Sequence, residues 1–594
     1  MKSSRLVLGI LIVLTFCVAG WAQTGSITGT VKDPSGAAIA GATVVVSSPD
    51  KGINREMQTN SSGDYNQSGL NQGVYDIIVT ANGFKKYQAK AVKLDVAEKA
   101  RVDVTLQVGA ATTEVIVEGS NVAQVETQSS ELAGTVTGKE ITQLQLNGRN
   151  FTTLVTLVPG VSNQTGADEP QVGINGSVAF SMNGGRTEYN NWELDGGDNM
   201  DNGSNSTLNV YPSVDSIAEF KVLTSNYGAQ YGRNGSGTVE VETKSGTRAF
   251  HGNAYEFVRN DAFNALNYAD MASHGGSGKI APYKKNDFGY TIGGPVFIPG
   301  LYNKDKQKTF FFWSQEWRRE RVPASFNTTV PYSAERSGDF SDLCPNPSVS
   351  TTFQRDDESA ANYFPDCPGT MSAGVWNIFP NNKIGVDPAA AALLPLIPVG
   401  TVDVPGAASY IANVTLPTSW REELVRVDHN INDHNRLTFR YIHDSWNTIE
   451  PGPIWDDASF PTVQTAFDGP GVSMVARLTS NISPTLLNEF VASYTTDHIS
   501  FKSVGYFQRP ANFPMGFIFN NGFGGKLPAI NLSGGIYDGI AEDPNGIWPE
   551  GPYNSNPTYT YRDNLTKIVG RHNLTFGAYF VAGQKNELSS VQVN

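Results

Sequence analysis

Alternating apolar and polar residues run through most of this chain, and the longest alternations come in pairs joined by a short turn. In ELVRVDHNINDHNRLTFRYIHD, Val425 and Val427 alternate with Arg426 and Asp428, and after the turn the same period resumes from Leu437. A period of two residues places successive side chains on opposite faces of a β-strand. The segment therefore predicts an antiparallel hairpin with one apolar face and one polar face.

Similar patterns recur over residues 247–594. YTYRDNLTKIVGRHNLTFGAYFVAG places two alternating runs around a turn at 570–573, and NISPTLLNEFVASY adds a further turn and strand. Strands of about 10 residues, joined alternately by tight turns and by long loops such as 320–415, predict an antiparallel transmembrane β-barrel with a wet lumen. The aromatic residues expected in its interfacial girdles are Phe311, Trp313, Trp317, Tyr441 and Tyr494. A soluble β-sandwich is the alternative, but it rarely combines such short turns with such long loops.

Residues 25–108 show shorter strands at closer spacing. GSITGTVKDPSGAAIAGATVVVSS puts Ile27 and Val31 on one face, turns at 33–36 and resumes at Val44. A later strand is expected to point Tyr75, Ile77 and Val79 inward. Short strands with turn residues between them predict a small β-sandwich of immunoglobulin-like or transthyretin-like type. Residues 109–125 read as a linker that contains one extended stretch, TTEVIVEGS.

Residues 126–246 change character and predict a mixed α/β domain. NGRNFTTLVTLVPGV has apolar residues at helical spacing and ends at Pro159-Gly160. YGAQYGRNGSGTVEVETKSG raises the question of a phosphate-binding loop, but such a loop needs a helix after its glycines. Here Val239 and Val241 alternate with charged residues, so the glycines lead into a strand.

The first 22 residues have the pattern of an export signal. Lys2 and Arg5 precede an apolar stretch, and small residues lead to a predicted cleavage after Ala22. An uncleaved anchor is the alternative, although the apolar stretch is shorter than the roughly 20 residues that a spanning helix needs.

The bulk composition argues against some classes of function. Charged residues make up 17% of the chain and aromatic residues 10%, and the formal net charge is -14. A soluble protein usually has roughly 25% charged residues, so the charge content is low. Nucleic acid is not expected as a partner, because phosphate binding needs clustered Lys and Arg.

Few residues suggest covalent or catalytic chemistry. Cys344 and Cys367 remain after removal of the signal and form a candidate disulfide, with two free thiols as the alternative. Seven histidines are scattered without paired metal-ligand spacing, and no nucleophile elbow occurs. We therefore expect no catalytic residues, no metal, no cofactor and no enzyme activity.

Several motifs together carry a family resemblance. They are GTVKDPSGAAIAGATV, SSGDY and GVYDIIVTANGF in the sandwich, then NGRNFTTLVTLVPGV, NGGRTEYNNWELDGGDN and IAEFKVLTSNYGAQYGRNGSGTVEVETKSG, and finally FHGNAYEFVRND, NDFGYTIGGPV and KTFFFWSQEWRRER. The first group resembles the carboxypeptidase regulatory-like domain, a non-catalytic fold. The complete series resembles TonB-dependent outer-membrane receptors of the Oar-like group, with residues 126–246 as a plug domain in the barrel.

The resemblance implies location, partners and mechanism. It places the protein in the outer membrane of a Gram-negative-type bacterium, among lipid, where it binds an extracellular ligand such as a carbohydrate or peptide. TonB, driven by an ExbB/ExbD-type motor in the inner membrane, would pair with a short extended box and pull the plug. The alternative is a surface adhesion or carbohydrate-binding protein that uses the barrel only as an anchor.

The resemblance also suggests site residues. The candidate TonB box is Glu114, Val115, Ile116, Val117 and Glu118, with a sandwich strand or a spacer as the alternative. In the plug, the polar positions Arg149, Arg186, Asp195 and Arg233 are candidates, each of which could equally form a structural ion pair. The glycines before Val239 are expected to let the backbone pass close to the barrel wall.

One feature departs from the family. Twenty-two strands of about 10 residues, with loops, need more chain than residues 247–594 supply. SSVQVN also lacks the aromatic strand usual at the end of such barrels. We therefore expect only the N-terminal part of a barrel, from a truncated chain.

Overall fold

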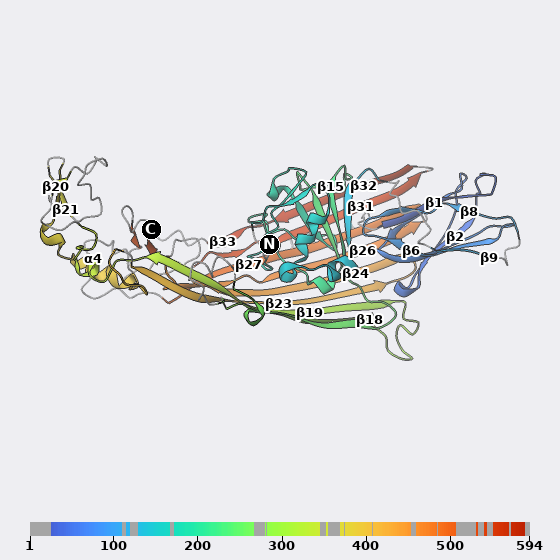
Figure 1. Ribbon diagram of the computed structural model, residues 1–594. Helices are drawn as coiled ribbons and strands as arrows, with labels where there is room; N and C mark the ends of the chain where they lie inside the picture. Colours follow the sequence, from blue (N-terminus) through green and yellow to red (C-terminus); the bar gives the residue numbers. More distant parts are fainter. Residues whose placement is uncertain are drawn as a thin grey trace, which may run out of the picture.

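The computed structural model shows a large curved sheet, an inner domain within its curve and a small sandwich at one end (Figure 1). The structure describes residues 25–109, 114–118, 129–166, 171–266, 280, 282–344, 352–353, 369–372, 375–406, 408–452, 459–483, 485–505, 530–532, 540–542, 551–569 and 572–588. The predicted export signal lies outside these residues. No helix among them is long and apolar enough to span a membrane.

The sandwich consists of two sheets with an apolar layer between them. One has the order β4-β1-β7, with β8 also paired to β1, and the other has the order β3-β2-β5-β6-β9. The strands are β1 (Gly25–Lys32), β2 (Thr43–Ser48), β3 (Ile53–Gln58), β4 (Asp64–Leu70), β5 (Gly73–Thr80), β6 (Lys86–Leu94), β7 (Lys99–Arg101), β8 (Val104–Thr105) and β9 (Glu114–Glu118), with the turn η1 (Pro49–Lys51). Ile27, Val31, Tyr75, Ile77 and Val79 are all buried in this layer, as their alternation predicts.

The inner domain is a mixed five-stranded sheet of order β10-β15-β16-β13-β14, with short helices on one side. Its elements are β10 (Leu132–Thr137), α2 (Gly138–Gln143), η3 (Asn147–Arg149), η4 (Phe151–Leu157), β11 (Val161–Asn163), β12 (Phe180–Met182), η5 (Thr187–Tyr189), β13 (Asn191–Leu194), β14 (Gly197–Asp198), η6 (Val214–Ser216), β15 (Ile217–Ser225) and β16 (Thr238–Thr243). The predicted helix of Phe151 is a 3-10 helix, and its ring packs edge-on against Trp192 and Phe220. A capping box at Thr137 and Glu140 begins α2.

The large sheet contains twelve strands among the described residues, with β17 and β32 at its edges. They are β17 (His251–Asn260), β18 (Lys284–Pro295), β19 (Thr309–Thr329), β23 (Ser409–Asn430), β24 (Asn435–Glu450), β25 (Gln464–Asp468), β26 (Gly471–Ser483), β27 (Leu486–Val504), β30 (Tyr553–Ser555), β31 (Thr558–Val569), β32 (His572–Gly583) and β33 (Asn586–Leu588). Their mutual pairings are antiparallel. Figure 1 shows the sheet curving around the inner domain.

The two faces of this sheet differ as the alternation predicts. Leu437, Phe439 and Phe576 are exposed on the outer face, whereas Arg426 and Asp428 are buried on the inner face. The inner domain packs against the inner face among the described residues, and a wet lumen stays a prediction. A single apolar core joins residues of both bodies.

Two details of the predicted strands need correction. The strands β19 and β23 have 21 and 22 residues instead of about 10, and they pair along their whole length up to Thr329 and Ser409. Their outer halves fall within residues 320–415, which the sequence predicts as a long loop. In the last hairpin, β32 already begins at His572, so His572 and Asn573 belong to the strand and not to the turn.

The long β19–β23 ribbon carries an outer group of short elements (Figure 1). They are η8 (Glu335–Ser337), β20 (Thr352–Phe353), β21 (Gly369–Ser372), β22 (Val375–Ile378), η9 (Pro380–Asn382), α4 (Pro388–Leu393), η10 (Leu394–Leu396), β28 (Ile530–Asn531) and β29 (Ala541–Glu542); η7 (Asp261–Phe263) follows β17. A small apolar cluster of Val330, Ile397, Phe460 and Ile540 holds together segments that lie far apart in the sequence.

The sandwich sits at the opposite end, against the short turns of the large sheet (Figure 1). Arg55 donates a hydrogen bond to the backbone oxygen of Asp433 in the β23–β24 turn. The Asn430 amide donates to the Lys51 backbone oxygen at 3.2 Å. The sandwich therefore caps the end of the large sheet that carries the short turns.

Candidate functional site between the inner domain and the large sheet

Arginines of the large sheet and carboxylates of the inner domain form a buried ionic cluster. The Asp195 carboxylate accepts hydrogen bonds from Arg426 at 3.0 Å and from Arg440 at 2.9 Å. Glu242 pairs with Arg477 at 2.7 Å and with Arg426 at 3.3 Å. All five residues are buried. Charges so placed need a partner, because desolvating an unpaired charge is costly.

The strand register explains why this cluster forms. Arg426 and Arg440 are direct cross-strand partners on β23 and β24, and like charges placed opposite each other destabilise a sheet. Asp195 lies between them and offsets this repulsion. On β16, Val239 and Val241 face the inner-domain core while Glu242 faces the arginines, so both faces of that strand are buried.

A second ionic contact extends the cluster toward the last strands. The Glu193 carboxylate pairs with Arg562 at 2.9 Å, and Arg562 also donates to the backbone oxygen of Gly196 at 2.7 Å. Arg562 and Arg477 lie on strands separated by β27. A band of arginines on the inner wall thus faces a matching set of acids on β13, on β16 and at Asp195 in the β13–β14 turn.

A different band lies next to it and is acidic. Glu316, Glu422 and Asp444 are consecutive cross-strand partners on β19, β23 and β24, and all are buried. The inner-domain segment around η6 runs across them. The backbone N–H of Ser213 donates to Glu422 at 2.5 Å, and that of Tyr211 donates to Asp444 at 2.7 Å. Backbone donors therefore seat this segment on the acidic band.

The four predicted inner-domain positions have different environments. Asp195 joins the buried cluster, and Arg149 pairs with Asp215 at 2.8 Å and lies 3.9 Å from the centroid of the Phe257 ring. Arg233 pairs with Asp198 at 2.6 Å. Arg186 is exposed and lies over the ring of Tyr189. The structure thus brings Asp195 and Arg149 to the wall, while Arg186 contacts only its own domain in the described interactions.

Sequence reasoning did not single out the wall arginines. Arg426 and Arg440 are visible as polar positions in alternating strands, but nothing local distinguishes them from exposed positions. Their partner Asp195 is 231 and 245 residues away in the chain. The signal available in the sequence was that four arginines, Arg426, Arg440, Arg477 and Arg562, fall at inward-facing positions of the predicted barrel strands.

The inner-domain carboxylates respond differently to burial. Burial acts against the charged form of Asp195, but Arg426 and Arg440 outweigh it and hold its pKa at about 2. Burial raises the pKa of Asp198 to about 6 despite the neighbouring Arg233. Burial and the nearby Asp95 raise the pKa of Glu219 to about 8, against the hydrogen bond from the Val96 backbone.

The candidate TonB box is a strand of the sandwich in this structure. Residues 114–118 form β9, which pairs in parallel with β6 at the edge of its sheet. Lys86 and Glu114 form an ion pair at 2.7 Å, and Val115 packs against the sandwich core. Ile116 is 51% exposed. The sandwich-strand alternative therefore describes the observed position, and binding of TonB stays a prediction.

Two further expectations concern the glycines and the cysteines. The glycines before Val239 pack against their own domain and not against the wall: a Cβ at Gly237 would lie 2.2 Å from the Met182 sulfur. Other glycines approach the wall: by the same criterion Gly246 lies 2.2 Å from the Phe311 backbone oxygen and Gly197 lies 2.7 Å from the Val475 side chain. Cys344 is disulfide-bonded, and Cys367 lies outside the described residues, so their pairing stays a prediction.

Comparison with known proteins assigns the family. Residues 242–593 match the family described as an outer membrane beta barrel domain, and residues 26–107 match the carboxypeptidase regulatory-like domain. The chain belongs to the outer membrane beta barrel family and is a protein of the Gram-negative outer membrane.

More particular relatives are transporters. The chain is 24% identical over 311 residues to the TonB-dependent transporter Oar of Myxococcus xanthus, covering 50% of this chain and 27% of that protein. The solved outer membrane transporter YddB of Escherichia coli aligns over 76% of this chain and 48% of its own, at 9% identity and a TM-score of 0.42. The ferric enterobactin receptor PfeA of Pseudomonas aeruginosa aligns over 78% and 51%, at 10% identity and 0.40. The chain thus spans about half or less of these relatives.

Proposed function

We propose that this protein acts as a TonB-dependent receptor or transporter, in which the inner domain is a plug. Residues 126–246 would form the plug and residues 247–594 the barrel part, with an extracellular ligand binding at the outer loops. The observation that carries the proposal is the ionic cluster of Asp195 and Glu242 with Arg426, Arg440 and Arg477. It joins the inner domain to the wall through side-chain ion pairs, whereas the wall strands pair with each other through their main chains.

The same contacts suggest how the plug is retained and released. Each buried pair holds the plug firmly, because removing one partner leaves an uncompensated charge. A pull on the N-terminal side of the plug would load the sandwich contacts first and the ionic cluster afterwards. Force relayed from the proton-motive force through TonB and an ExbB/ExbD-type motor is the proposed source of the pull. The proposal contains no catalytic step and no cofactor.

The proposed contact for TonB is the open edge of β9. In the described residues this strand pairs on one side only, with β6, so its other edge can accept an extended segment through main-chain hydrogen bonds. Ile116 is exposed beside that edge. The sandwich would then hold the box in an extended form.

The test is site-directed disulfide crosslinking of the full chain in membranes to the periplasmic domain of TonB carrying one cysteine. Ile116→Cys should crosslink, because its side chain lies beside the open strand edge. The matched control is Val74→Cys, an equally exposed valine of the same sandwich. Equal crosslinking of both variants, or of neither, would show that residues 114–118 are not the contact for TonB.

A second candidate function is adhesion with the barrel as anchor. The extended β19–β23 ribbon and its outer cluster favour it, because they project a packed structure away from the wall. The two functions differ in one property: an anchor has no need for the inner domain to move. Movement of the plug therefore distinguishes them.

A further inference from the structure

A polar cavity lies in the seam between the sandwich and the periplasmic turns of the barrel. It has a volume of about 320 Å³ and is lined from both bodies. The sandwich side comes from β3 and β4, and the barrel side from the β23–β24 turn, the β26–β27 turn and the end of β31. Neither body alone encloses it. A volume of this order is at the lower end of the range for small-molecule sites.

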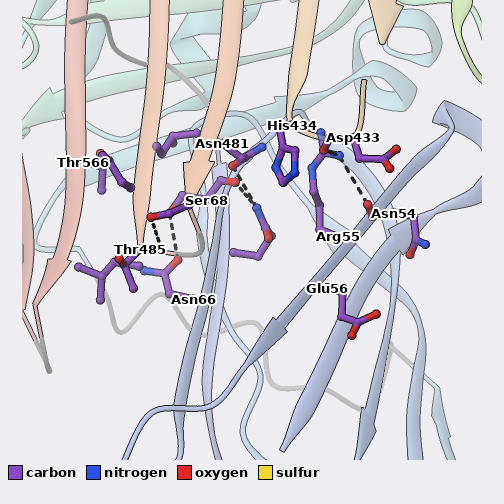
Figure 2. A pocket seen from close by; sticks show the side chains of 15 residues that line it. Asn54, Arg55, Glu56, Asn66, Ser68, Asp433, His434, Asn481, Thr485 and Thr566 are labelled. Atoms are coloured by element: carbon purple, nitrogen blue, oxygen red, sulfur yellow. Dashed lines mark hydrogen bonds between the residues drawn. The ribbon is translucent and has the colours of Figure 1, made fainter. Parts of the chain in front are cut away.

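Eight of the fifteen lining residues are Asn, Gln, Ser or Thr, and Arg55, Glu56, Asp433 and His434 add charged or titratable groups. Asn54, Asn66 and Gln67 supply side-chain amides from the sandwich, and Asn481 supplies one from the barrel, while hydroxyl groups come from both bodies. Figure 2 shows Asn66 and Ser68 of the sandwich beside Thr485 of the barrel turn, with the Ser68 hydroxyl donating to the Asn66 side-chain oxygen at 3.0 Å. Each amide presents a donor and an acceptor side by side.

One of these groups has an unused donor. The Asn481 side-chain oxygen accepts a hydrogen bond from Gln67 at 3.4 Å, across the seam. Its side-chain nitrogen is buried and has no partner among the described residues. A buried donor without a partner carries a free-energy cost that a ligand oxygen would remove. The barrel side also contributes an apolar strip of Leu486, Leu487 and Ile568.

This combination fits one kind of ligand. Paired amides match the neighbouring hydroxyl groups of a sugar ring, and an apolar strip matches the C–H face of that ring. We propose that the seam binds a neutral pyranose unit of a periplasmic glycan, held by Asn54 and Asn66 from one side and Asn481 from the other. The bound sugar fastens the sandwich to the barrel. This binding is independent of the proposed transport.

The test is titration calorimetry of the full chain in detergent with two probes, chitotriose and maltotriose. We expect saturable binding of one or both. Binding of chitotriose alone identifies an N-acetylated amino-sugar chain as the source, and binding of maltotriose alone a plain glucan. Asn54→Ala and Asn481→Ala should each weaken binding about tenfold or more, because each removes hydrogen bonds from one wall. The matched control Asn82→Ala changes an exposed sandwich residue outside the cavity and should leave binding unchanged.

Two results would overturn the proposal. One is the absence of saturable binding of either sugar. The other is loss of binding with Asn54→Ala but not with Asn481→Ala, since that would place the sugar on the sandwich alone. Both variants change side chains at a seam and leave the core layers intact, and circular dichroism verifies that they fold.

Discussion

At the scale of single residues, the distribution of charge on the inner wall explains how the inner domain is oriented. Acids on β13, on β16 and in the β13–β14 turn pair with the arginines, and backbone N–H groups around η6 donate to the acidic band. A shift of the inner domain along the wall would bring its acids toward Glu422 and Asp444. The two bands therefore oppose such a shift by repulsion as well as by lost pairing.

Asp195 compensates the charges of two buried arginines, Arg426 and Arg440. Asp195→Asn should destabilise the seating of the inner domain by about 3 kcal/mol or more, because Arg426 and Arg440 then lie buried and opposite each other with less compensation. Asparagine tolerates the positive φ of 51° at this position, so the backbone is not the cause. Urea titration of protease resistance in the inner domain measures the effect.

The exposed Glu188→Gln is the control for that change, because it removes a carboxylate from the surface of the same domain. The double variant Asp195→Asn with Arg440→Met should recover part of the lost stability, because one of the two facing charges is gone. An Asp195→Asn protein as resistant as the unchanged one would show that the cluster does not hold the domain.

At the scale of elements, alternation predicted most of the fold. The hairpin of Arg426 and Leu437 and the buried faces of the sandwich follow from a period of two. The outer half of β19 was not predicted as a strand, although Val322, Ala324 and Phe326 lie on one face of it, and it pairs with β23 along its whole length. The partners of Arg426 could not be predicted either, since they depend on packing between segments far apart in the sequence.

The contact between the sandwich and the inner domain should weaken as pH rises. The Glu219 side chain accepts a hydrogen bond from the Val96 backbone, and its pKa is raised to about 8 in this contact. A carboxyl whose pKa is higher in contact than free holds its proton when docked and loses it when separated. Docking is therefore strongest below the free pKa of about 4.5 and weakens as pH rises through 8.

Hydrogen exchange at residues 95–98 between pH 5 and pH 9 measures this loosening, after correction for the intrinsic exchange rate. Glu219→Gln should remove most of the pH dependence, because the amide does not titrate. Identical pH profiles for the unchanged protein and the variant would contradict the assignment to Glu219.

At the scale of the whole molecule, the sandwich lies at one end of the large sheet and the β19–β23 ribbon extends from the other, with the inner domain between them inside the sheet (Figure 1). The sandwich contacts the barrel turns and also carries the strand proposed to receive TonB. The inner domain contacts the wall through polar and apolar residues alike. A TonB-dependent transporter requires the inner domain to leave the wall when TonB pulls. An adhesion protein that uses the barrel as an anchor requires the inner domain to stay.

The most direct measurement is labelling of a cysteine at Val475 in living cells with a membrane-impermeant thiol reagent. Val475 is buried on the wall behind the inner domain, in contact distance of Gly197. Ser333→Cys, on the exposed outer part, is the control that labels under all conditions. If the protein is a transporter, we expect Val475→Cys to be labelled only in energised cells that contain TonB. Labelling that is absent in such cells, or equal without TonB, would contradict it.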